Sequence, residues 1–460
     1  MMPLWEGWDE YAHFAWLEHR NEKGTLPKYT TPVSREIEAS LEVTPLSEEL
    51  KWMGPEHFSY REWWALPAGE RAARSERLAA LRGELRAEEP RGALVFYEAQ
   101  QPPLYYWLMS VPERLASRWP LRDRVILVRL LSLLLASAVI PLGWFAVMAL
   151  LGEGAATLGA ALLAVAPGLA IDTSRVANDG LAITVTALIL LILVKRWPDW
   201  ALGVALGAAL LSKPYLLSMV PVVLLLRRKD ALRPVAIALA VAGWWYARNL
   251  AIGYSMSGWL DRAEPGAIAA AITQVNWLSA ANVTAKSFLW FGGWSFLTLK
   301  SWAYTVLEVI GTAGFLLALR RRDLGVAWAM FGFHVLAMSY GVLVSFVAHR
   351  QSNLPGWYLW PLAAPLALLL VAGLGRWVAG LIVLLGIADV YGAAALLAPY
   401  YSGLSPRNKA NAGQFLAALD RLNVPVWLAA AWFLATVALV VISAYKCGRN
   451  QHRTTSETAS

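Results

Sequence analysis

The sequence has few charged residues and almost no cysteine for its length. Only 16% of its 460 residues are Asp, Glu, Lys or Arg, whereas soluble globular proteins carry roughly a quarter. The one cysteine, Cys447, cannot form an internal disulfide. These absences exclude a disulfide scaffold and a highly charged disordered chain. With 58% apolar residues and 24 tryptophans, they favour a polytopic membrane protein of all-α class.

Motifs for nucleotides and nucleic acids are also missing. The sequence contains no glycine-rich phosphate loop, dinucleotide fingerprint or HExxH zinc helix. No stripe of Lys and Arg with interleaved aromatics predicts a nucleic-acid groove, although the net charge is +8. We therefore expect no nucleic-acid partner and no nucleotide-driven reaction.

The charge is divided unevenly along the chain. Residues 1–124 carry a net charge of −4, and residues 125–460 carry +12. This contrast predicts an extracytoplasmic or interfacial segment over 1–124 that holds short interfacial helices, such as an amphipathic stretch at 68–88. It also predicts a transmembrane domain over 125–446 and a cytoplasmic tail over 447–460.

The transmembrane domain contains about eleven apolar stretches that could cross a bilayer. They are 125–151, 155–172, 179–195, 199–212, 214–226, 231–252, 302–319, 324–347, 357–375, 377–398 and 425–445. The fourth and fifth are short and meet at Lys213-Pro214, so they are either two half-length helices or one kinked region.

Basic clusters predict the orientation of this multi-pass protein. Arg227-Arg228-Lys229, Arg320-Arg321-Arg322, Arg376 and the C-terminal tail fall at ends assigned to one side. By the positive-inside rule that side is cytoplasmic. Eleven crossings then place residues 1–124 outside a membrane that we expect to be a bacterial cytoplasmic membrane.

The first polar cluster is Asp9-Glu10, followed by His13. Acids are favoured in the first turn of a helix, so capping alone would explain them. A general base facing the outer membrane surface is the functional alternative. Asp9 and His13 are four residues apart and share a helix face. Two ligands do not define a metal site, so a divalent metal stays an open possibility.

The second cluster comes before a Pro-Pro pair. Aromatic residues after the prolines are typical of an interfacial anchor. Anchoring does not explain Glu98 and Gln101, which come just ahead of the aromatics. We expect these two side chains to contribute to a binding site.

Ionisable residues also occur inside or beside the apolar stretches. Asp172, Arg175 and Asp179 lie at membrane depth or just outside it, although Asp179 would also suit a helix start. Lys213 lies at the proline break, where it either snorkels or meets an anion. Broken helices recur where membrane proteins build binding sites.

Three further candidates lie near the outer ends of later helices. Arg248 is either an exposed anchor or a site cation. Arg350 and Tyr358 flank the Pro355-Gly356 turn. The predicted topology puts all of these candidates beneath one outer surface.

In this order the clusters resemble the motifs of the integral-membrane GT-C glycosyltransferases, which include protein O-mannosyltransferases and lipid A aminoarabinose transferases. The resemblance rests on these runs: Asp9-Glu10…His13, Glu98 to Tyr106, Asn178 to Ala182, Leu211-Ser212-Lys213, Trp245 to Asn249 and Gly356 to Pro361. Two features depart from the family pattern. No apolar run for the family's first transmembrane helix precedes the acidic motif, and Trp357 stands where Arg is commoner.

The resemblance implies transfer of a sugar from a polyprenyl-phosphate donor to an acceptor hydroxyl on the extracytoplasmic side, with inversion. It implies that Asp9, or else Glu10, is the base. Lys213 and Arg248 would stabilise the leaving phosphate. Donor-binding roles would fall to His13, Glu98, Gln101, Asp179, Arg350 and Tyr358. No cofactor is firmly implied.

Two alternatives remain at this stage. A transporter or flippase of lipid-linked sugars would use the same cavity and broken helix. A catalytically inactive, lipid-binding member of the family is the other. The residues do not identify the sugar, and the acceptor could be a glycan, a lipid or a protein.

Overall fold

The computed structural model describes residues 2–53, 58–90, 94–256, 261 and 263–457. In this part every regular element is a helix, and the extended pairings are two isolated bridges, Pro32 with Val95 and Gly292 with Leu297. The prediction of an all-α protein is confirmed for these residues.

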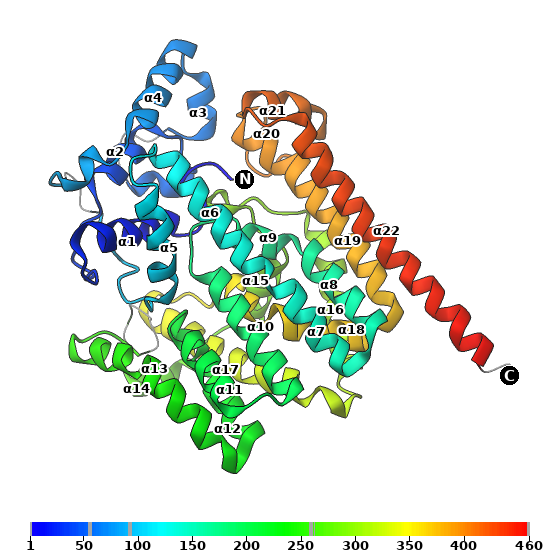
Figure 1. The fold of residues 1–460 in the computed structure, drawn as a ribbon. Helices are drawn as coiled ribbons and strands as arrows, with labels where there is room; N and C mark the ends of the chain where they lie inside the picture. The colour runs from blue at the N-terminus through cyan, green and yellow to red at the C-terminus, as the bar shows by residue number, and fades with distance from the viewer. Residues whose placement is uncertain (1, 54–57, 91–93, 257–260, 262, 458–460) are drawn as a thin grey trace.

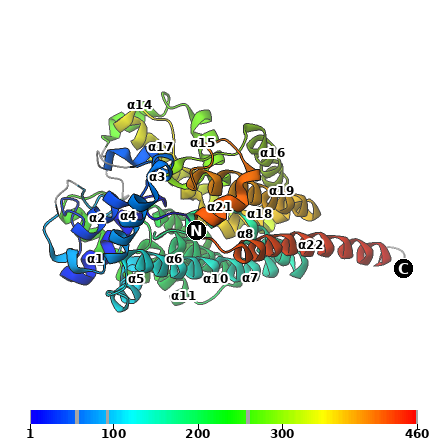
Figure 2. The ribbon, with the colours of Figure 1, turned by 90° about the horizontal axis from the view of Figure 1, so that it is seen from above.

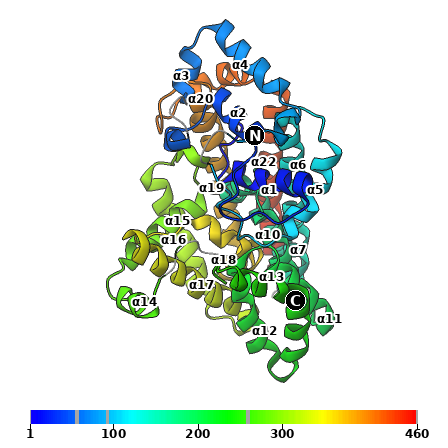
Figure 3. The ribbon, with the colours of Figure 1, turned by 90° about the vertical axis from the view of Figure 1, so that its left-hand side faces the viewer.

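The first 120 residues form short helices at the left and top of Figure 1. They are α1 (Glu10–Lys23), α2 (Arg35–Val43), η1 (Glu48–Met53), α3 (Tyr60–Ala65), α4 (Ala68–Ala80), η2 (Glu84–Ala87) and α5 (Leu104–Leu115). The amphipathic stretch expected over 68–88 is divided, because Gly83 adopts a left-handed φ of 98° between α4 and η2. Figure 3 shows α1 across the middle of the molecule, between α4 above and α12 below.

The rest of the chain forms a bundle of longer helices. Its first half is α6 (Leu121–Ser137), α7 (Val139–Leu151), α8 (Glu153–Val165), α9 (Pro167–Thr173), α10 (Asp179–Lys195), α11 (Asp199–Leu210), η3 (Pro214–Ser218), α12 (Met219–Arg227), η4 (Arg228–Ala231) and α13 (Leu232–Ala251). Its second half is α14 (Pro265–Ala271), α15 (Trp277–Leu289), η5 (Gly293–Ser295), α16 (Ser301–Ala318), η6 (Arg322–Leu324), α17 (Gly325–His349), η7 (Gly356–Leu362), α18 (Ala363–Leu374), η8 (Gly375–Trp377), α19 (Val378–Tyr391), η9 (Gly392–Leu397), α20 (Ala398–Tyr401), η10 (Ala412–Gln414), α21 (Phe415–Arg421) and α22 (Val426–Glu457).

Several helical runs of the described chain are apolar and long enough to cross a membrane. Five pass by length and composition: Leu121–Leu151, Ser301–Ala318, Arg322–His349, Gly356–Tyr401 and Val426–Tyr445. The pair Glu153–Val165 and Pro167–Thr173, bent by 56°, would make a sixth. An integral multi-pass membrane protein is therefore confirmed, whereas its orientation stays a prediction.

The predicted count of eleven spans is not confirmed. α11 has 12 residues, which make about 18 Å of helix against a hydrocarbon core of roughly 30 Å. The run Gly356–Tyr401 has 46 residues, which is about twice the length of one span. Gly375 interrupts that run with a φ of 54°, so η7 with α18 on one side, and α19 with η9 and α20 on the other, can each cross once.

α1 is attached to the bundle along one side by buried polar contacts. Glu10 near its start pairs with Arg129 of α6, with Arg129 Nε donating to Glu10 Oε1 at 2.7 Å. One turn further on, His13 Nδ1 lies 2.7 Å from the Tyr106 hydroxyl of α5. These contacts fix both the height and the rotation of α1, and so the position of its N-terminal end.

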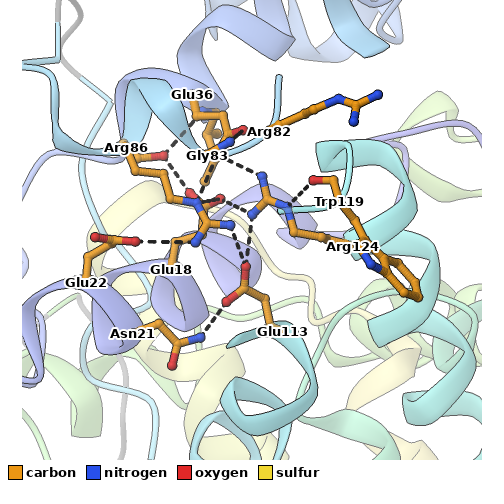
Figure 4. A network of polar contacts seen from close by, with 12 residues as sticks. Glu18, Asn21, Glu22, Glu36, Arg82, Gly83, Arg86, Glu113, Trp119 and Arg124 are labelled. Carbon is orange, nitrogen blue, oxygen red and sulfur yellow. Dashed lines mark hydrogen bonds and ion pairs between the residues drawn. The ribbon is translucent and has the colours of Figure 1, made fainter. Parts of the chain in front are cut away.

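The far half of α1 joins a buried ion-pair network, shown in Figure 4. The carboxylates of Glu18, Glu36 and Glu113 share the guanidinium groups of Arg86 and Arg124, with N···O distances of 2.8 to 3.4 Å. Burial raises the pKa of Glu18, and the neighbouring Glu36 raises it further. The five residues come from α1, α2, η2, α5 and α6, so the network ties the first 120 residues to the bundle.

α22 packs against the bundle along one side only. Figure 2 shows it projecting beyond the other helices. Trp432 Nε1 of α22 donates to Asp389 Oδ2 of α19 at 3.2 Å. Gly386 of α19 lets the Thr436 methyl approach, since an added Cβ there would lie 3.3 Å from that methyl. One polar contact and one small residue therefore set the register of α22.

Candidate active site

Asp9 lies at the N-terminal end of α1 with a left-handed φ of 56°, a conformation that Asp adopts more readily than most residues. Its side chain is partly exposed. Asp9 Oδ1 accepts a hydrogen bond from the Tyr97 hydroxyl at 2.7 Å. The helix start thus holds a carboxylate that a substrate can still reach.

Glu10 is placed very differently from its neighbour. It is fully buried. Arg129 donates to both of its oxygens, at 2.7 and 2.5 Å, and the Val176 amide donates to Oε1 at 2.9 Å. Through these contacts Glu10 anchors the start of α1 to α6. Asp9 is therefore the carboxylate of the acidic motif that a substrate can reach.

A chain of buried charges lies beside Asp9. Arg175 Nη2 contacts Asp172 Oδ1 at 2.7 Å and Asp179 Oδ2 at 2.8 Å. Lys213 Nζ contacts Asp179 Oδ1 at 3.1 Å. The charges of Arg175, Lys213 and Asp179 all act on the pKa of Asp9, so the four groups form one electrostatic cluster.

The loop before α1 packs directly on Arg175. Arg175 Nη1 donates to the Trp8 carbonyl oxygen. A Cβ at Gly7 would lie 2.6 Å from the Arg175 Cβ, so only glycine allows this approach. The structure therefore brings together the acidic motif and the Asp179 segment, as the sequence predicted for one outer site.

Lys213 lies at the predicted helix break. α11 ends at Leu210, and Lys213 is extended, with φ −146°, before the prolyl turn η3. Two side chains fix this break: Asn178 Nδ2 donates to the Ser212 oxygen at 2.8 Å, and the Tyr246 hydroxyl donates to the Leu210 oxygen at 2.8 Å. The ammonium is thus held in the interior and does not snorkel outward.

Burial and neighbouring charges set the protonation of the groups around Asp9. Burial raises the pKa of Asp9, which Tyr97 and the nearby cations partly oppose. Burial also raises the pKa of Glu98 to about 7, and the charge of Asp9 raises it further. The pKa of His13 is lowered well below its usual value, first by burial and then by Lys213. His13 is therefore neutral at pH 7.

The groups behind Asp9 leave hydrogen-bond acceptors without donors. Glu98 Oε2, Asp172 Oδ2 and Asn178 Oδ1 are buried and have no partner among the described residues. Gln101 Oε1 is satisfied by Asn178 Nδ2 at 3.1 Å. Buried oxygens without donors are costly, so a ligand that offers hydroxyl groups would suit this side of the cluster.

The later candidates are placed at different distances from the cluster. Tyr358 contacts the ring of Tyr215 at 5.3 Å between centroids, and the Tyr215 hydroxyl donates to Asp179 Oδ1 at 3.3 Å. Arg248 lies over the Trp245 ring and donates to the Asn249 side chain at 2.9 Å.

Arg350 is exposed and lies over the Phe346 ring. Among the described residues, neither Arg248 nor Arg350 makes a hydrogen bond or ion pair with Lys213. Their roles in donor binding stay predictions.

Trp357, at the position where the family resemblance led us to expect Arg, stacks on Trp8. The two rings are 4.4 Å apart with an interplanar angle of 20°. Trp294 and Phe296 meet the other edges of the Trp8 ring. An aromatic wall therefore stands beside Asp9 in place of a cation.

Several partners that hold the site were not among the predicted residues. Tyr97 and Tyr215 each donate a hydrogen bond to an acidic site residue, and neither was predicted to do so. Arg129 read as part of an apolar helix. Its place inside the predicted span 125–151 was an available signal, because a cation within an apolar span needs a partner.

A metal centre is not formed by the protein alone in the part of the chain that the structure describes. No group of three His, Cys, Asp or Glu side chains with suitable placement occurs there. His13 Nδ1, one of the two expected ligands, is engaged with Tyr106. Metal dependence stays open.

The chain shows partial similarity to solved structures of two proteins. The crystal structure of ArnT from Cupriavidus metallidurans in the apo state has a TM-score of 0.44 and 17% identity, covering 94% of this chain and 72% of that chain. The same protein bound to undecaprenyl phosphate has a TM-score of 0.42 and 18% identity, covering 95% and 73%.

The oligosaccharyltransferase of Archaeoglobus fulgidus, in complex with Zn and sulfate, has a TM-score of 0.35 and 16% identity, covering 68% of this chain and 45% of that chain. Neither a protein-family model nor a curated protein matches the sequence.

Proposed function

We propose that this protein is a membrane glycosyltransferase that moves a sugar from a polyprenyl-phosphate donor to an acceptor hydroxyl on the extracytoplasmic side. The observation that carries the proposal is the placement of Asp9: a reachable carboxylate beside the buried cations Lys213 and Arg175. A base for one reactant and positive charge for the other are what such a transfer needs.

Asp9 takes the proton of the acceptor. As the acceptor oxygen bonds to the anomeric carbon, its hydrogen passes to the Asp9 carboxylate. The bond from the anomeric carbon to the phosphate oxygen breaks, and its electron pair stays on the phosphate. Attack opposite the leaving phosphate inverts the anomeric centre. Tyr97, at 2.7 Å from Oδ1, orients the carboxylate for this step.

Lys213 stabilises the leaving phosphate. Its ammonium has three N–H donors, one of which faces Asp179, so others can meet phosphate oxygens. Asp179 is held in turn by Arg175 and Tyr215 and positions the ammonium. Glu98 and Gln101, with the oxygen acceptors behind Asp9, would bind hydroxyl groups of the sugar. His13, as a neutral ring, would help to orient Tyr106.

A transporter of lipid-linked sugars is the competing function. It would share the broken helix at Lys213, but it would not need a carboxylate held against an outer tyrosine. An inactive lipid-binding protein is a third possibility. The two alternatives differ from an enzyme in whether the glycosyl bond is cleaved.

The test is to reconstitute the purified protein in vesicles that contain polyprenyl-phosphate sugars labelled in the sugar. We expect label to leave the lipid and polyprenyl phosphate to accumulate, whether an added acceptor or water receives the sugar. Movement of the intact lipid across the bilayer without cleavage would establish the transporter instead. Binding without either event would establish the inactive protein.

A further inference from the structure

Away from the candidate active site, a cavity with a volume of about 480 Å³ lies between α8, α15, α16 and α18. Its walls are aliphatic and aromatic side chains, among them Phe288 and Trp360, whose rings stack at 4.2 Å. Only three lining side chains carry oxygen: Asn282, Glu308 and Thr312. The cavity is therefore lined by apolar side chains and one acidic side chain, Glu308.

Glu308 is the only charged residue of α16, a helix long and apolar enough to cross a membrane. Its Oε1 atom is buried and has no hydrogen-bond partner in the described chain. Tyr304, one turn away, does not satisfy it, because the Tyr304 hydroxyl donates to the Trp290 oxygen at 2.7 Å. Ionisable groups at such positions are costly and have a task or a partner.

Glu308 lies well inside α16. It is seven residues after Ser301, the first residue of α16, which corresponds to roughly 10 Å along the helix. Its side chain is half-buried and lines the cavity. A ligand in the cavity can therefore reach its unpartnered oxygen.

The cavity is distinct from the candidate active site, but two segments, α9 and η7, contribute residues to both. α9 contributes Pro167 to the cavity and Asp172 to the charge cluster. η7 contributes Trp360 to the cavity and Tyr358 to the ring contact with Tyr215. A ligand in the cavity would therefore contact both α9 and η7.

We propose that this cavity binds an amphiphile with one apolar chain and a protonated primary amine, with the amine against Glu308. The walls match the chain, and the one charged side chain of the lining is negative. The oxygens of Asn282 and Thr312 can accept the remaining ammonium hydrogens. Attraction between the two charges is strong where water is excluded.

The same lining disfavours related ligands. An alkyl carboxylate would be repelled by Glu308, and an alcohol would offer one hydrogen and no charge. The order of affinity for equal chains is therefore amine, then alcohol, then carboxylate. This order does not depend on the proposed glycosyltransferase activity.

The experiment measures binding of decylamine, decanol and decanoate to the full chain in a neutral detergent at pH 7, counted as bound mass by native mass spectrometry. We expect one decylamine per chain. Glu308→Gln should weaken decylamine binding about tenfold or more, the effect of losing one charge-assisted contact. Glu264→Gln, the same change at an exposed position, should leave binding unchanged.

A second variant tests the cavity itself and keeps the charge. Gly311 lines the cavity, and a Cβ there would meet no atom within 4 Å, so Gly311→Leu should fill part of the cavity. Decylamine binding should then be lost. Equal binding of decanol and decylamine, undiminished binding in Glu308→Gln, or undiminished binding in Gly311→Leu would overturn the proposal.

Discussion

At the scale of single residues, the two adjacent acids of the motif have different tasks because their surroundings differ. Asp9 is partly exposed with one tyrosine partner, whereas Glu10 is sealed against Arg129. Asp9 precedes the helix in a left-handed conformation and Glu10 is the first residue of α1, so Asp9 meets Tyr97 while Glu10 faces Arg129 of α6. Composition alone could not have assigned these roles.

Removal of Glu10 should damage folding more than chemistry. Glu10→Met leaves the Arg129 guanidinium buried without its counter-charge, which costs about 3–5 kcal/mol. The double variant Glu10→Met/Arg129→Met should recover part of that loss. Thermal unfolding in detergent measures both. A single variant as stable as the parent protein would show that Glu10 does not anchor α1.

Removal of the Lys213 charge should weaken donor binding. Lys213→Met keeps the apolar stem, so the lost charge-assisted contact with phosphate should cost about 2 kcal/mol. Lys229→Met, on an exposed turn, is the matched control. Undecaprenyl phosphate is the probe, and titration of the purified protein measures its affinity. Equal affinities in all three proteins would mean that Lys213 does not contact the phosphate.

Glu98 should shift the acid limb of the pH profile, which the ionisation of Asp9 produces. Asp9 accepts a proton only when ionised, and its pKa is raised by burial, so turnover should fall as the pH drops through that raised value. Glu98, with a pKa of about 7, interacts with Asp9. Glu98→Gln removes a neighbouring negative charge, lowers the pKa of Asp9 and moves the acid limb to lower pH.

The profile of kcat/KM against pH checks this sign. A limb that stays in place or moves to higher pH in Glu98→Gln would contradict the coupling. The control is Gln101→Asn, which changes a nearby neutral amide and should leave the acid limb of the profile unmoved.

At the scale of elements, the sequence predicted the helices well and their partners poorly. The proline after Lys213 predicted the break that the structure contains. The apolar stretches correspond to helices, and the short fourth stretch is the 12-residue helix α11. The count of eleven included such short stretches, which a bilayer-spanning length excludes.

The site was predictable only in part for a related physical reason. Charged residues within apolar stretches are unusual because they are costly there, so Asp179 and Lys213 could be predicted as site residues. Tyrosines suit both interfaces and hydrogen bonds, so Tyr97 and Tyr215 could not be distinguished from anchors. Arg248 and Arg350 were expected near the phosphate because of their order in the sequence, and the contacts of the structure do not connect them to Lys213.

At the scale of the whole molecule, the account requires the acidic motif and the loop before α21 to face outside. In a Cys447→Ser background, cysteines placed at Arg77 of α4 and at Lys409 should react with an impermeant reagent added outside. A cysteine at Lys229 should be spared. All three original side chains are exposed, so differences report the side of the membrane. The reverse pattern would invert the topology.

The measurement that tests the central claim most directly is turnover of a polyprenyl-phosphate sugar by Asp9→Asn, compared with equal amounts of folded parent protein. The Asp9 side chain makes no capping hydrogen bond to α1, and asparagine keeps the shape and an oxygen that can accept from Tyr97, but it cannot accept the proton. We expect turnover to fall by ~10²–10⁴, with undecaprenyl phosphate affinity nearly unchanged because the base acts on the acceptor. Near-normal turnover in Asp9→Asn would contradict the account.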